Sequence, residues 1–69
     1  MSPNAGLFSQ ALELVRREFT EKTWQAFWRT TVEHQRPADV AAELGMTAMA
    51  VRQAKSRVLR RLREDLAEP

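Results

Sequence analysis

The segment from Thr47 to Leu66 has the pattern of one long amphipathic helix, and this pattern constrains the fold of the chain more than any other. Its apolar side chains recur every three or four residues, so at about 100° per residue they share one helical face. These residues are Val51, Ala54, Val58, Leu62 and Leu66. The opposite face carries Met49, Gln53, Ser56, Arg57 and Arg60. One side of the helix can therefore pack on a core while the other side remains free to bind a partner.

The rest of the sequence also follows a helical period, and it shows none of the alternation that is typical of strands. We expect a first helix over residues 7–18, a second helix after an N-cap at Thr20, and a third helix that begins at Pro37 and ends at Gly45. The residues expected in their core are Phe8, Ala11, Leu12, Val15, Phe19, Trp24, Phe27, Trp28, Val32, Val40, Ala41 and Leu44. The sequence predicts an all-α fold, a compact bundle of four helices without a wing.

The length of the chain, 69 residues, is that of one small domain. Because there is no cysteine, the fold depends on apolar packing without disulfides or thiolate metal sites. We expect a disordered end or linker over residues 1–6, the domain over residues 7–66 and a short tail over residues 67–69. No apolar stretch resembles a membrane span or a signal peptide, so we expect a cytoplasmic protein that does not bind membranes.

The charges of the chain are unevenly distributed. Residues 1–46 contain 5 basic and 6 acidic side chains, whereas residues 47–63 contain 6 basic ones and none that is acidic. The basic residues of the second group are Arg52, Lys55, Arg57, Arg60, Arg61 and Arg63. A helix that concentrates cations in this way indicates an anionic partner such as nucleic acid.

The span from Pro37 to about Leu59 fits a helix-turn-helix motif. Ala41 is small where the two helices would approach most closely, and Gly45 permits the positive φ of a tight turn. Met46 and Val51 are expected to point inward and to set the angle between the helices. A cap at Thr47 then begins the basic helix. These residue types follow from geometry, and they predict a motif that places its second helix against DNA.

Two tracts, LELVRREFTEKTWQAFWRTTVE and ADVAAELGMTAMAVRQAKSRVLRRLREDL, resemble region 4 of bacterial sigma factors of the extracytoplasmic-function class. The resemblance covers nearly all of residues 7–66. It implies a domain that reads the promoter −35 element through its last helix, docks on the β flap of RNA polymerase and directs transcription initiation. Nothing in the chain resembles region 2, which binds the −10 element, so the resemblance implies a C-terminal domain of a longer factor.

The resemblance and the helical projection select nearly the same DNA-binding residues. The predicted base contacts are Arg52, Gln53, Ser56 and Arg57. The predicted phosphate contacts are Thr47, Lys55, Arg60 and Arg61. Arginine can bond guanine and glutamine can bond adenine with two hydrogen bonds each, which favours Arg52 and Gln53 for direct readout. Lys55 lies beside the apolar face, so we expect its stem to pack and its ammonium group to reach outward.

Two alternatives remain open at this point. One is the helix-turn-helix effector domain of a response regulator, and the other is a protein-interaction bundle that binds polymerase or an anti-sigma factor and holds DNA weakly. In the second case the edges of Trp24 or Trp28, with Leu12 or Phe8, would line a groove for a partner helix. His34 is expected to be a surface or capping residue. The sequence contains no nucleophile–base arrangement, so we expect no enzyme. We also expect no metal and no cofactor. Because one −35 element is not a palindrome and no apolar stripe is left over, we expect a monomer.

Overall fold

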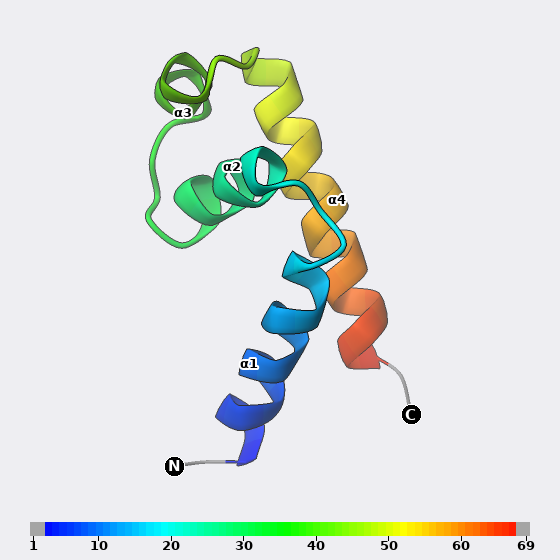
Figure 1. Cartoon of the computed structure of the whole chain (residues 1–69). Coiled ribbons are helices and arrows are strands. Elements are labelled where there is room, and N and C mark those ends of the chain that lie inside the picture. The colour runs from blue at the N-terminus through cyan, green and yellow to red at the C-terminus, as the bar shows by residue number, and fades with distance from the viewer. Residues whose placement is uncertain (1–2, 68–69) are drawn as a thin grey trace.

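The computed structural model describes the backbone of residues 3–67 and the side chains of residues 8–66. Within this range the chain forms four α-helices and no strand, which confirms the predicted all-α fold (Figure 1). The helices are α1 (Pro3–Arg16), α2 (Glu21–Thr31), α3 (Pro37–Leu44) and α4 (Ala48–Ala67). None of the described helices is long and apolar enough to cross a membrane.

Helix α4 is the element on which the other three pack. Figure 1 shows α1 beside the C-terminal half of α4, α2 across its middle and α3 near its N-terminal end. As a result, the start of α1 and the end of α4 lie at the same end of the molecule, opposite the α3–α4 connection. The connection between α3 and α4 is therefore held away from the part of the bundle that α1 covers.

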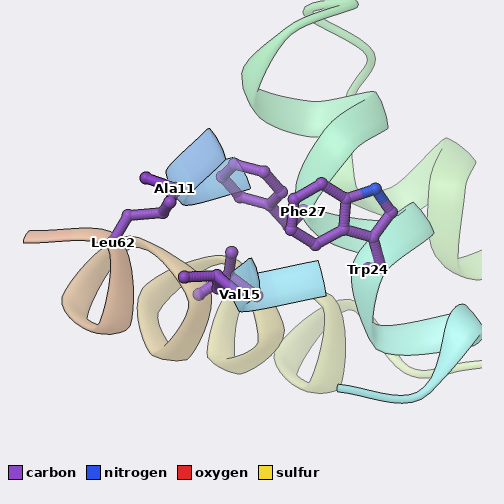
Figure 2. Close-up of a cluster of buried hydrophobic side chains, with 6 residues drawn as sticks. Ala11, Val15, Trp24, Phe27 and Leu62 are labelled. Atoms are coloured by element: carbon purple, nitrogen blue, oxygen red, sulfur yellow. The ribbon is translucent and has the colours of Figure 1, made fainter. Parts of the chain in front are cut away.

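The core consists of two clusters, and α4 contributes to both. The first joins α1, α2 and α4, and Figure 2 shows Phe27 of α2 between Trp24 of the same helix and the neighbouring Ala11 of α1 and Leu62 of α4. Its buried members are Ala11, Val15, Trp24, Phe27, Val58 and Leu62. The second joins α2, α3 and α4 through Ala26, Val40, Ala41, Val51 and Ala54. Because one face of α4 enters both clusters, the opposite face is fixed relative to α3.

The helix ends carry the predicted caps. The backbone N–H of Thr23 donates to Thr20 Oγ1 over 3.2 Å, so Thr20 is the N-cap of α2. Gly45 ends α3 in the left-handed conformation with φ 68°. The main difference is at the N-terminus, where α1 begins at Pro3 and not at Leu7. Proline has the φ of a first helical turn, and one glycine inside a helix is tolerated at a cost of about 1 kcal/mol.

Several core predictions were wrong at the edges of the bundle. Phe8, Val32 and Leu66 are 48%, 46% and 50% exposed. Val32 and Leu66 lie at the C-terminal ends of α2 and α4, and Phe8 lies in the N-terminal half of α1. Trp28 is only partly buried and packs on the edge of the first cluster, while Trp24 is buried. Thr30 was not expected in the core, but it is buried. Its hydroxyl donates to the Ala26 carbonyl over 2.7 Å, which satisfies the polar group inside the core. Residues 1–2 and 68–69, where ends or tails were predicted, lie outside the described residues.

Candidate nucleic-acid interface

The turn between α3 and α4 is closed by backbone and side-chain hydrogen bonds. The N–H of Met46 donates to the Ala41 carbonyl over 2.8 Å, across the left-handed Gly45. One residue further, Thr47 Oγ1 accepts a hydrogen bond of 3.0 Å from the N–H of Ala50, which caps the first turn of α4. A Cβ at Gly45 would meet nothing within 4 Å, so glycine is needed for its φ and not for space. The turn therefore has the form of a helix-turn-helix connection.

Small and β-branched residues bring α3 and α4 together. Val40 and Val51 are fully buried, and Ala41 and Ala54 are almost so. Alanines at this contact let the two backbones approach closely, and the stiff valines fill the space without rotamer freedom. Met46, from the turn, is partly buried against the same cluster. This packing sets the direction of α4 relative to α3.

The outer face of α4, defined here as Met49, Arg52, Gln53, Ser56, Arg57 and Arg60, is exposed along its whole length. The structure brings the four predicted base-contacting residues together on this face. Gln53, Ser56, Arg57 and Arg60 also line one shallow hollow on its surface. Lys55 is half-buried beside this face, in keeping with the expected packing of its stem. What the outer face presents is mainly hydrogen-bond donors and positive charge.

The cations of the outer face are free of carboxylate partners. Among residues 8–66, Arg52, Arg57 and Arg60 have no carboxylate at ion-pair distance. Elsewhere the structure pairs Arg16 with Glu21, Arg29 with Glu43 and Arg61 with Glu18. A free guanidinium keeps all its donors for a ligand, whereas a paired one must first give up its carboxylate. The outer face therefore presents three arginines close together whose donors are all available to an anion.

Arg61 does not belong to this face, although we predicted a phosphate contact for it. Its Nε donates to Glu18 Oε1 over 2.8 Å, and its Nη1 lies 3.6 Å from Asp65 Oδ1. The hydrogen bond to Glu18 raises the pKa of Arg61 above its ordinary value. Arg61 thus links α4 to the turn that follows α1, and helical periodicity alone gave no sign of a partner 43 residues away.

The N-terminus of α4 offers further donors. Thr47 is exposed, and the first turn of α4 has no acidic side chain. The free N–H groups of a helix start and its positive dipole end favour phosphate, and an acidic residue there would weaken this preference. The predicted phosphate contact at Thr47 therefore has suitable surroundings, next to the outer face.

A second hollow lies between α1 and α2, where we expected a groove for a partner helix. It is lined by Ser9, Leu12, Glu13, Arg16, Trp24, Gln25 and Trp28. The guanidinium of Arg16 lies over the ring of Trp24, with 5.9 Å from its Cζ to the ring centroid. Trp24 and Trp28 stack with their centroids 6.2 Å apart. Phe8, which we also placed here, is not part of the lining.

His34 lies after α2 and is exposed, as expected for a surface residue. It has a positive φ of 58°, and the N–H of Gln35 after it donates to the Arg29 carbonyl over 2.9 Å. His34 therefore closes the C-terminal end of α2 in the left-handed conformation. Histidine is among the residues that adopt this conformation more often than most, but the sequence pattern gave no specific signal for it.

Comparison with known proteins identifies one family. A family model described as "KORA: TrfB plasmid transcriptional repressor" matches residues 5–69. The searches of curated proteins and of solved structures gave no match. The match covers all four helices except the first two residues of α1.

This finding corrects the resemblance to sigma region 4, which was wrong. The family is one of transcriptional repressors, so DNA binding and transcription regulation stand, while promotion of transcription as a sigma factor does not. The β flap of RNA polymerase and an anti-sigma factor were expected as partners only through that resemblance, and they lose their basis with it. The response-regulator alternative is likewise not the family that matches.

Proposed function

We propose that this chain, which belongs to the family of KorA (TrfB) plasmid transcriptional repressors, represses transcription by reading an operator sequence in the DNA major groove with the outer face of α4. One observation carries the proposal. The inner face of α4 is anchored in both core clusters, while its outer face holds free arginines and polar side chains next to a helix-turn-helix connection. A rigid helix with exposed donors is what direct readout of base edges requires.

In this proposal Arg52, Gln53, Ser56 and Arg57 contact bases. The two arginines and the glutamine have the donor and acceptor geometry for guanine and adenine edges, and Ser56 can donate to or accept from either. Arg60, Lys55 and Thr47 bind the phosphates on both sides of the groove and fix the register of α4. Repression then follows from occupancy, because a protein bound across promoter DNA excludes polymerase from the same surface. The protein catalyses nothing in this mechanism.

The experiment is a selection from a randomised duplex library with the purified protein at two salt concentrations, followed by sequencing of the bound fraction. Enrichment of one motif with a steep salt dependence supports the proposal. Binding without any enriched motif contradicts it. The same data give the number of chains bound: a single half-site favours the monomer that we expected, and paired inverted half-sites favour a dimer.

Variants of single residues test the readout itself. Arg52→Ala and Gln53→Ala should each relax the motif at one base pair, with a loss of discrimination of about 1 to 3 kcal/mol. Arg17→Ala is a matched control, since Arg17 is an exposed arginine in the turn directly after α1, away from the outer face. It should leave the motif unchanged. If Arg52→Ala and Gln53→Ala instead weaken every duplex equally, these side chains do not read bases.

A further inference from the structure

Met49 is an apolar side chain in the middle of a polar surface. It is 67% exposed, more than Phe8, Leu14, Val32 or Leu66, the other large apolar side chains that the described residues leave exposed. It lies in the first turn of α4 and packs on neither core cluster. At about 100° per residue it stands opposite the fully buried Val58, so it is on the centre line of the outer face.

The neighbours of Met49 are the residues proposed to read bases. Residues three and four positions apart are adjacent on a helix surface, which places Met49 directly beside Arg52 and Gln53. In helix-turn-helix proteins the base edges are reached mainly by residues near the start of the second helix. A single exposed apolar residue is common on protein surfaces and needs no explanation of its own. At this position, however, the α4 geometry that brings Gln53 to a base also brings Met49 into the groove.

The major groove offers one apolar group to such a side chain. The base edges present hydrogen-bond donors and acceptors, and only thymine adds a C5-methyl group. Methionine is unbranched, flexible and polarizable, so it can follow the groove surface and pack on a methyl group. We propose that Met49 contacts the C5-methyl of a thymine in the operator. This inference rests on the proposed DNA readout by α4. Met49 thereby selects thymine at a base pair adjacent to the one that Gln53 reads.

The test removes the thymine methyl group from the DNA and, separately, the Met49 side chain from the protein. Each thymine of the enriched motif is replaced in turn by deoxyuridine, which keeps base pairing and loses only the methyl. For the wild-type protein one such replacement should weaken binding about fourfold, the factor expected from burying one methyl group. For Met49→Ala the same replacement should have no effect, so that the double-mutant cycle shows coupling. A 5-methylcytosine at that position should bind the wild-type protein more tightly than cytosine.

Leu66→Ala is the matched control, because Leu66 is a half-exposed apolar residue near the other end of α4. It should keep the full effect of deoxyuridine, and circular dichroism should show both variants folded. If a motif is enriched but no thymine is coupled to Met49, or the motif has no thymine beside the Gln53 position, the inference about Met49 is refuted and DNA readout by α4 stands. If no motif is enriched at all, the proposed function and this inference are both refuted.

Discussion

Arg60 and Arg61 are adjacent on α4, and the structure predicts opposite roles for them in DNA binding. Arg60 is exposed and lines the hollow of the outer face with Gln53, Ser56 and Arg57. Arg61 is held by Glu18 at 2.8 Å. Changing either arginine to glutamine removes one positive charge from the same helix. We expect Arg60→Gln to lose a phosphate contact and Arg61→Gln to lose an internal ion pair.

The expected size of the effect follows from counterion release. Each phosphate that a protein neutralises adds about 0.9 to the slope of log K against log salt concentration. Between about 50 mM and about 200 mM salt, one contact of this kind therefore changes affinity by a factor of about 3.5. Across this salt range, the affinity of Arg60→Gln should therefore fall by a factor that is about 3.5 times smaller than for the wild-type protein. The reduction should be the same for the enriched motif and for a scrambled duplex, because phosphate contacts carry no sequence information.

Fluorescence anisotropy with labelled duplexes at several salt concentrations measures both slopes. Arg61→Gln should bind with the wild-type slope and show a lower thermal unfolding temperature, since the bond from Arg61 to Glu18 ties α4 to the turn that follows α1. Arg60→Gln should unfold as the wild-type protein does. The reasoning is refuted if Arg61→Gln flattens the slope as much as Arg60→Gln, or if Arg60→Gln leaves it unchanged. Either result would mean that the outer face is not the surface that lies along the phosphates.

Three further predictions concern the fold. Val58→Ala removes two methyl groups from a fully buried position, at about 0.8 kcal/mol each plus a cavity term, so urea denaturation should show a loss of about 2 to 3 kcal/mol. Gly45→Ala places a Cβ at φ 68°, which should cost about 1 to 2 kcal/mol in the same assay and, with open space around it, leave the DNA motif unchanged. Hydrogen bonds from Gln25 first, and then Arg16, lower the pKa of the Glu21 carboxyl. Ionised Glu21 therefore stabilises the fold at pH values above its unfolded-state pKa, and this contribution is lost as the pH falls through its folded-state pKa. When the free energy of unfolding is measured as a function of pH, Glu21→Gln should lack this part of the loss of stability in acid.

The ends of α3 and the start of α4 could be predicted from the sequence because each carries a chemical marker. Pro37 has the φ of a first helical turn, Gly45 supplies the left-handed conformation, and Thr47 supplies the cap. The start of α1 carries no such marker, and Gly6 suggested a break where the helix continues. A glycine lowers helix stability without forbidding a helix, so it is a weaker signal within a helix than at its end.

The residues of the outer face could be predicted from helical periodicity, whereas the ion pair of Arg61 could not. Periodicity within one helix fixes which side chains share a face, and it placed Gln53, Ser56 and Arg57 together. It does not reveal which of the cations meet a carboxylate from another helix. Glu18 reaches Arg61 only because Ala11 and Val15 dock α1 along the C-terminal half of α4. Long-range pairing of this kind depends on the assembled core, which the local pattern does not contain.

The error about the family has a physical cause as well. Ala41, Gly45 and Val51 are required by close helix approach, positive φ and core packing, and any protein that uses this motif must satisfy the same demands. Such residues predict the geometry of α3 and α4 and, with free arginines, DNA binding. They carry no information on whether the bound protein recruits polymerase or excludes it. That outcome depends on where the operator lies and on what else the chain contacts, so two proteins can share this helix and act on transcription in opposite directions.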